Sequence, residues 1–178
     1  RDLSQETAGR LFDRLLAEHG MTGRAAVRSF IETKTGLIYF GKIKRSGLPV
    51  MLKEYPASKL KGIDGKQMKE YENTVLALGF MDREALGKYN AKIHGLVSHE
   101  NNRYMVFEDL GEITLKEYLF RRKTFLPKGQ VLLIAFGILS ALRVYAEMRL
   151  VHRGVHLMNI FMAGDRCVLG PPEPLAEE

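Results

Sequence analysis

The sequence is poor in cysteine and in long uncharged apolar runs. Cys167 is the single cysteine among 178 residues, which excludes an internal disulfide and a cysteine-rich zinc site. We expect it to be a small buried strand residue. The most apolar stretch, "VLLIAFGILSALRVYAEM", is uncharged only from Val131 to Leu142. That is too short to span a bilayer, so we expect a buried helix and no membrane span.

The composition is that of a basic globular protein. Hydrophobic residues make up 46% of the chain and charged residues 27%, and the net charge is +6. A basic balance favours acidic partners, and the densest basic clusters lie at 58–69 and 120–123. Such runs are more often solvated faces, so we do not expect nucleic acid as a partner. The lysine run at 59–69 keeps nucleic-acid binding open as an alternative.

The first segment of the chain is not a transit peptide, because it carries the acidic residues Asp2, Glu6, Asp13 and Glu18. The chain starts with Arg1, which leaves room for a targeting segment that has been removed. We expect an intracellular protein, located in the cytoplasm or, after such a removal, inside an organelle.

The order of the predicted elements indicates an α+β fold with two lobes. Apolar spacing and turn residues predict helices at 4–18, 66–80, 114–122 and 129–148, and strands at 27–34, 37–43, 49–54, 91–100 and 103–110. Two short strands, "IFM" and "RCVL", precede an irregular end, "GPPEPLAEE". We therefore expect a helical extension at 1–26, a first lobe at 27–110 and a second at 111–178.

An ordered series of segments resembles the protein kinase family across about residues 30 to 170. The series is "GLIYFG", "VMLK", a glutamate on the following helix, "YMVFEDL", the long apolar helix and "HRGVHLMN". The resemblance implies a kinase-like bilobal fold, with a five-stranded antiparallel sheet and one helix in the N-lobe. It also implies a shortened helical C-lobe, because the chain has no counterpart of the later kinase helices.

The resemblance places a glycine-rich, phosphate-covering loop at "GLIYFG", with Gly36 as its third glycine. The first two glycine positions fall on Ile31 and Thr33, whose branched side chains do not permit the close backbone approach of glycine. The same residues also fit an ordinary β-hairpin.

The resemblance implies an ion pair between Lys53 of "VMLK" and Glu72 on the next helix. Val75 and Leu76 follow Glu72 by three and four residues and are expected on the inward face. Glu70 is the alternative partner. The pair would anchor the helix to the sheet whether or not a nucleotide binds.

Large side chains are expected to fill the adenine pocket that the resemblance implies. Four apolar residues would line that slot: Ile38, Met51, Phe107 and Phe161. Side chains of this size can themselves complete the hydrophobic column that adenine completes in a kinase. We therefore expect these side chains to fill the adenine pocket themselves.

The loop "HRGVHLMN" lacks the carboxylate that the resemblance would lead one to expect. Gly154 replaces the acid that accepts the substrate proton, and His156 replaces the lysine that steadies the transferred phosphate. Gly170 stands where the main magnesium-binding acid belongs, which leaves Asn159 as the remaining metal-ligand position. One neutral amide is a poor anchor for Mg²⁺, so we expect no metal site and no ATP or magnesium cofactor.

Two other residues could supply chemistry to this loop. Asp165 lies in the turn "AGDR", which points away from the cleft in a kinase fold. His156 could act as a base near neutral pH, but it would still lack a metal. His152 is expected to support the loop by packing and hydrogen bonding, and His156 to be exposed or to face a partner.

These residues predict a catalytically inactive kinase-like domain, a pseudokinase, that acts as a protein-binding scaffold or a structural subunit of a larger assembly. The apolar helix at 129–148 and the C-terminal tail are the expected partner surfaces, because a helix that is apolar on nearly all sides requires cover on nearly all sides. The alternative is an atypical protein kinase with weak activity that binds ATP through Lys53, Glu72 and Asn159.

Overall fold

The computed structural model describes residues 30–32, 37–42, 46–99, 101–164 and 166–174. The helix predicted at 4–18 lies outside these ranges. Contacts divide the chain into two compact units, one formed by residues 1–62 and 94–109, the other by 63–93 and 110–178. The predicted lobe boundaries differ from these units and stay a prediction, and each unit is described below by itself.

The first unit contains the five-stranded sheet that the sequence predicts. Its strands are β1 (Phe30–Glu32), β2 (Leu37–Lys42), β3 (Pro49–Tyr55), β4 (Ile93–His99) and β5 (Asn102–Glu108), in the spatial order β1-β2-β3-β5-β4. The pairings of β3 with β2 and β5 are antiparallel. A short helix, α2 (Ala57–Leu60), which the sequence analysis did not predict, follows β3.

Side chains are buried on both faces of the central strand β3. Directly opposed residues of an antiparallel pair share a face, so Met51 lies beside Phe107, its partner on β5. On the opposite face, the hydroxyl of Tyr39 donates a 2.8 Å hydrogen bond to the buried carboxylate of Glu54. A strand that is buried on both sides reads as a continuous apolar run, and "VML" is such a run.

Helix α3 (Gly65–Gly79) opens the second unit and begins at a capping box. Asp64 accepts a 2.7 Å hydrogen bond from the backbone N–H of Gln67, whose side chain accepts one from the backbone of Asp64. The buried residues Tyr71, Val75 and Leu78 recur at helical spacing. Leu76 is 61% exposed, so the prediction that it faces inward is wrong: it lies about 100° around the helix from Val75.

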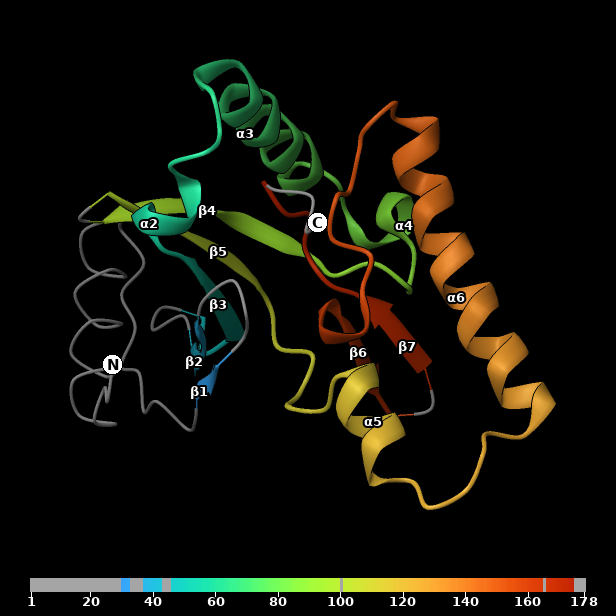
Figure 1. Ribbon diagram of the computed structural model, residues 1–178. Coiled ribbons are helices and arrows are strands. Elements are labelled where there is room, and N and C mark those ends of the chain that lie inside the picture. The colour runs from blue at the N-terminus through green and yellow to red at the C-terminus, as the bar shows by residue number, and fades with distance from the viewer. Residues whose placement is uncertain (1–29, 33–36, 43–45, 100, 165, 175–178) are drawn as a thin grey trace. The chain divides into compact units, whose positions relative to one another are not determined.

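The rest of the second unit surrounds a small β-hairpin. Its elements are α4 (Arg83–Leu86), α5 (Leu115–Arg121), α6 (Lys128–Glu147), the 3₁₀ turn η1 (Leu157–Asn159), β6 (Ile160–Ala163) and β7 (Arg166–Leu169). Figure 1 shows α6 alongside β7, with α5 near β6. Gly164 adopts a φ of 65° in the hairpin turn, a conformation that glycine accepts without strain. The sequence predicted the helices and hairpin but not α4 or η1.

The inner face of α6 contains two small residues, Gly137 and Ala141, which let the helix lie close to the hairpin. Its buried residues are Gly137, Ala141 and Tyr145, spaced four apart. A Cβ atom added at Gly137 would lie 2.6 Å from Sγ of Cys167, closer than packed atoms allow. Cys167 is buried on β7, as predicted.

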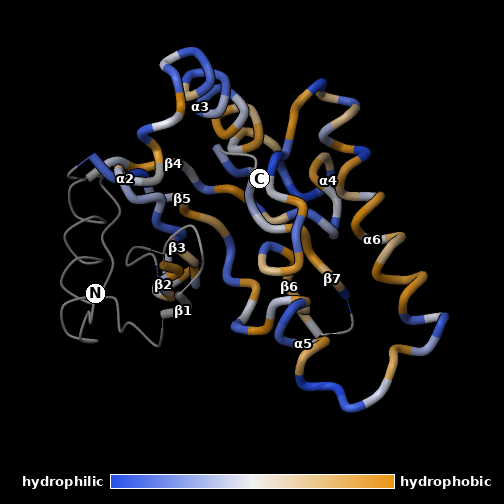
Figure 2. The backbone as a smooth tube through the Cα atoms, viewed as in Figure 1, coloured by the Kyte–Doolittle hydropathy of each residue, from blue (hydrophilic) through white to orange (hydrophobic). Residues whose placement is uncertain are grey.

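The outer face of α6 contradicts the expectation of a helix buried on nearly all sides. Its exposed apolar side chains are 47–68% accessible: Val131, Leu132, Leu133, Phe136 and Leu139. Figure 2 shows that apolar residues recur along most of the helix. Among the described helices, α6 is the one long and apolar enough to cross a membrane by length and composition. Its inner face nevertheless packs against protein, on the cluster that includes Leu115 and Leu169.

Candidate functional site

The candidate site is the loop between α6 and β6, which belongs wholly to the second unit. It follows a C-terminal turn of α6 in which Arg149 adopts a left-handed φ of 57°. The N–H groups of Arg149 and Leu150 bond to the carbonyls of Ala146 and Tyr145, which satisfies the last turn of the helix. Arg153 also adopts a left-handed φ, of 61°, so the backbone is strained inside the loop itself.

His152 holds the loop to the segment that follows β7. Its Nδ1 accepts a 3.0 Å hydrogen bond from the N–H of Gly154, so this nitrogen carries no proton. The proton is therefore on Nε2, which donates to the carbonyl of Gly170 at 2.8 Å. The ring is 4% exposed and packs edge-on against Tyr145, whose centroid is 4.9 Å away. This is the packing and hydrogen-bonding role predicted for His152.

Asn159 uses its amide group inside the protein. Its Nδ2 donates to the carbonyls of Gly154 at 2.8 Å and Pro171 at 2.9 Å, and its backbone carbonyl accepts from the N–H of Gly170 at 2.7 Å. The side chain is 1% exposed. Asn159, the residue predicted as the remaining metal ligand, thus uses both amide protons to link the loop to the segment after β7.

Gly170 has no room for the carboxylate that its position would hold in a kinase. A Cβ atom built there would lie 2.2 Å from Oδ1 of Asn159 and 2.8 Å from its backbone oxygen. Both distances are far inside van der Waals contact, and the second involves backbone that cannot rotate away. The absence of an acid at this position is therefore built into the packing.

The site does not fit the magnesium–ATP complex that a kinase fold implies. Gly154 and Gly170 supply no carboxylate, which leaves the neutral amide oxygen of Asn159 as the side-chain ligand predicted at this position. The described part of the chain contains no group of three or more His, Cys, Asp or Glu residues that could hold a metal ion. Because Mg²⁺ requires hard oxygen ligands in octahedral geometry, these residues are a poor set for it.

His156 differs from its prediction. Its side chain is 24% exposed, and its Nε2 lies 3.2 Å from Oε1 of Glu173, whose side chain is 1% exposed. The segment "GPPEPLAEE" is predicted to be irregular and to form a partner surface, whereas Pro171 to Pro174 are buried. Residues 170–174 are irregular, as predicted, but their burial contradicts the prediction that they form a partner surface. Residues 175–178 lie outside the described residues. Sequence reasoning missed Glu173, although an acid three residues after Gly170 was a usable signal.

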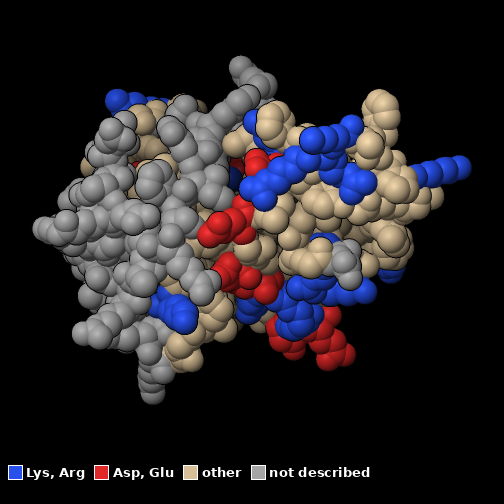
Figure 3. All heavy atoms as spheres, turned by 90° about the horizontal axis from the view of Figure 1, so that it is seen from below, with Lys and Arg blue, Asp and Glu red and all other residues tan. Residues whose placement is uncertain are grey.

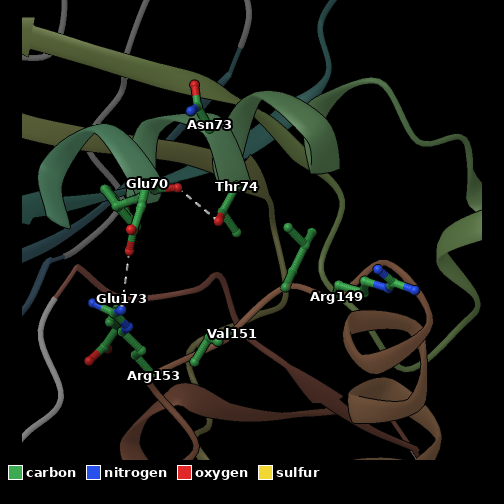
Figure 4. A pocket seen from close by; sticks show the side chains of 9 residues that line it. Glu70, Asn73, Thr74, Arg149, Val151, Arg153 and Glu173 are labelled. Carbon is green, nitrogen blue, oxygen red and sulfur yellow. Dashed lines mark hydrogen bonds and ion pairs between the residues drawn. The ribbon is translucent and has the colours of Figure 1, made fainter. Parts of the chain in front are cut away.

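A pocket of about 280 Å³ lies between α3 and the start of the loop. In Figure 4 the α3 residues Glu70 and Thr74 face the segment that carries Val151 and Arg153, while the Arg149 guanidinium points away. Glu70 and Arg153 form an ion pair at 3.8 Å. Glu70, the alternative partner considered for Lys53, thus contacts the loop arginine. The pair is partly exposed, with side chains 30% and 54% accessible, and its atoms are 3.8 Å apart, so it stabilises little.

The predicted nucleotide residues are distributed over both units. Lys53 is 2% exposed on β3, with its Nζ 5.5 Å from the centre of the Tyr55 ring. Glu72 is an exposed residue of α3, in the second unit. The ion pair between Lys53 and Glu72 stays a prediction. Of the glycine loop, Gly36 and Thr33 lie outside the described residues, as does Asp165.

The four residues predicted to plug an adenine pocket are all buried. Ile38, Met51 and Phe107 are at most 1% exposed on one face of the sheet in the first unit. Phe161 is fully buried on β6 in the second unit, where it bridges to Thr114. Their burial agrees with tight packing, and their role as a plug stays a prediction.

Comparison with known proteins agrees with this architecture. The sequence model of the protein tyrosine and serine/threonine kinase family matches residues 32–169. Two solved variants of the PknI kinase domain of Mycobacterium tuberculosis are similar, with TM-scores of 0.70 and 0.73 at 16% and 15% identity. The matches cover 84% and 85% of this chain. The comparison with curated proteins gives no match.

The chain spans 59% and 61% of the two PknI domains that it matches. At this identity the structural likeness shows the fold alone. The family match, by contrast, runs from the first described strand to the end of β7 and includes the loop and the hairpin. The chain therefore belongs to the protein tyrosine and serine/threonine kinase family.

Proposed function

We propose that this chain is a catalytically inactive member of the kinase family that serves as a protein-binding module. The observation that carries the proposal is the closed loop: Asn159 and His152 bond to the positions where both acids are missing. Phosphoryl transfer depends on positioning and on charge neutralisation by metal ions. With Gly154 and Gly170 at the two acid positions, neither the base nor the metal anchor is supplied.

The outer face of α6 supports a binding role. Five apolar side chains on one helix expose about half or more of their surface, and Phe120 and Phe125, which precede the helix in the sequence, are 84% and 99% exposed. Contiguous apolar surface of this kind marks an interface more often than a solvated face. We propose that another protein covers it, which makes the domain a scaffold or a fixed subunit of an assembly.

Nucleotide binding is tested by thermal shift of the purified protein with millimolar ATP and magnesium. We expect no shift, and no difference between the wild-type protein and Lys53→Ala. A magnesium-dependent rise in Tm that Lys53→Ala abolishes would instead favour the atypical kinase that binds ATP through Lys53, Glu72 and Asn159. Incorporation of labelled phosphate into any substrate would contradict inactivity directly.

The binding role is tested by affinity purification of the full-length protein with two matched variants. Leu139→Glu places a charge on the exposed face, and Val151→Glu places one at a similarly exposed apolar residue of the loop. We expect Leu139→Glu to lose a stoichiometric protein partner that Val151→Glu retains. If the full-length protein is monomeric and its Leu139 side chain resists hydroxyl-radical labelling, its own polypeptide covers the face and the proposed partner is wrong.

Nucleic acid is not the proposed partner. On the part of the surface shown in colour in Figure 3, basic side chains alternate with acidic and uncharged ones. Nucleic-acid sites gather Lys and Arg on one face. The prediction is that heparin releases the protein at or below physiological salt. Retention with a steep salt dependence that mutation of Lys61, Lys66 and Lys69 removes would reverse this assignment.

A further inference from the structure

The space left by the missing catalytic acid is occupied by another carboxylic acid. A Cβ atom built on Gly154 would lie 2.6 Å from Cγ and 2.9 Å from Cδ of Glu173. It would also lie 3.1 Å from Nδ2 of Asn159. Real side chains do not approach this closely, so the Glu173 side chain and any side chain at residue 154 exclude one another.

Glu173 is fixed in this position from both ends. Its backbone N–H donates a 3.0 Å hydrogen bond to the carbonyl of His152, and its carboxylate lies 3.2 Å from Nε2 of His156. Only 1% of its side chain is exposed. The two histidines stand on either side of Gly154 in the sequence, so both ends of Glu173 hold the stretch that contains the glycine.

Burying a carboxylic acid costs free energy unless its oxygens have polar partners. A buried glutamate in a loop therefore requires a compensating interaction. Here the gain is the closure of the loop against the segment after β7. Figure 4 shows Glu173 beside Arg153, in the wall of the pocket that faces α3. Its Cγ and Cδ atoms occupy the volume from which an aspartate at residue 154 would reach an acceptor hydroxyl.

We propose that Glu173 is a built-in occluding residue, which fills the catalytic-base position and locks the loop closed through His152 and His156. The inference rests on the proposed absence of phosphotransfer and deepens it. An acid restored at residue 154 has no space while Glu173 is present. The proposed inactivity then has two causes: the absence of the two carboxylates, and the packing of Glu173 against residue 154.

The test is a double-mutant cycle between residues 154 and 173, read as Tm of the full-length protein. Gly154→Ala adds only the Cβ atom, and Glu173→Ala removes the two atoms that it would strike. We expect Gly154→Ala to lower Tm by about 5 °C in the wild-type background. In the Glu173→Ala background the same substitution should change Tm by less than about 1 °C, so the two effects are strongly non-additive.

Three controls define the mechanism. Gly129→Ala, at an open position of α6, should not lower Tm, because no atom lies within 4 Å of the added Cβ. Gly170→Ala strikes Asn159 instead, so Glu173→Ala should not rescue it. Glu173→Gln keeps the Cγ and Cδ atoms, so Gly154→Ala should stay destabilising in that background. A rescue by Glu173→Gln as large as that by Glu173→Ala would assign the effect to charge and overturn the proposal.

Two results would overturn the proposal outright. One is additivity, in which Gly154→Ala costs the same with and without the Glu173 side chain. The other is a Gly154→Ala/Glu173→Ala protein that fails to fold, since removal of the occluding atoms must then give no relief. Phosphate incorporation is measured on the wild-type protein in parallel. Activity there would contradict the proposed function while the cycle still reports on the occlusion.

Discussion

Two regions of the second unit, the loop around Gly154 and the outer face of α6, differ in which kind of side chain they bury. In the loop around Gly154 the polar residues His152 and Asn159 are buried, and their hydrogen bonds run inward. The loop's apolar residues Val151, Val155 and Leu157 are instead exposed. The outer face of α6 is apolar, yet it lies open. The polar groups of the loop thus bond within this chain, whereas the apolar side chains on the outer face of α6 are exposed. Phosphoryl transfer would require the polar groups of the loop to be accessible, and protein binding would require the outer face of α6 to be accessible. Of these two, the outer face of α6 is the accessible one.

The largest expected effect tests how tightly the loop is closed. Gly170→Ala forces a Cβ atom onto the side chain and the backbone oxygen of Asn159. Because backbone cannot move aside cheaply, we expect a loss of about 3 kcal/mol in the free energy of unfolding, or about 10 °C in Tm. Chemical denaturation measures it. Gly65→Ala, with no atom within 4 Å, is the control, and equal stability of both variants would show that the loop is loosely packed.

The next effect compares the two faces of α6. Ala141 is 1% exposed against the hairpin, so Ala141→Leu overpacks the inner face and should cost about 2 kcal/mol. Leu139 is 67% exposed, so Leu139→Ser should change the free energy of unfolding by less than about 0.5 kcal/mol. Urea titration of both variants decides. Equal costs at the two positions would mean that the outer face is covered.

A smaller effect depends on pH and tests burial under α6. Burial raises the pKa of the Cys167 thiol above its ordinary value of 9.0. Above that pH the unfolded chain loses the thiol proton while the folded chain keeps it, so stability falls as pH rises. We expect Tm to drop more steeply between pH 8 and 10 in the wild-type protein than in Cys167→Ala. Parallel curves would place the thiol in contact with water.

The smallest effect tests the strained junction between the two regions. Arg149 holds a left-handed φ of 57° at the end of α6, where glycine is the favoured residue. Arg149→Gly removes the steric cost and should raise the free energy of unfolding by about 0.5–1 kcal/mol. Arg149→Ala, which keeps the Cβ atom, separates this effect from loss of the side chain. A stabilisation by Arg149→Ala as large as that by Arg149→Gly would contradict the conformational explanation.

Sequence reasoning succeeded where local pattern and structure coincide. Helix α3, helix α6 and the β6–β7 hairpin follow from apolar spacing and turn residues, and the family follows from the order of the segments. It failed where a side chain's surroundings come from distant segments. Leu76 belongs to an apolar run but faces solvent, and His156 sits in a loop but faces a buried acid. Spacing along one helix does not say which segment covers it.

What the sequence determined by itself is which side chains the loop carries. Gly154 and Gly170 carry no carboxylate in any fold, and this needed no coordinates. What only the tertiary structure decided is the use of the vacated space. Glu173 fills one position and Asn159 the other, because a side chain's neighbours are set by the return of the chain after β7. The sequence determines which side chains are present, and the packing of distant segments determines which of these side chains come into contact.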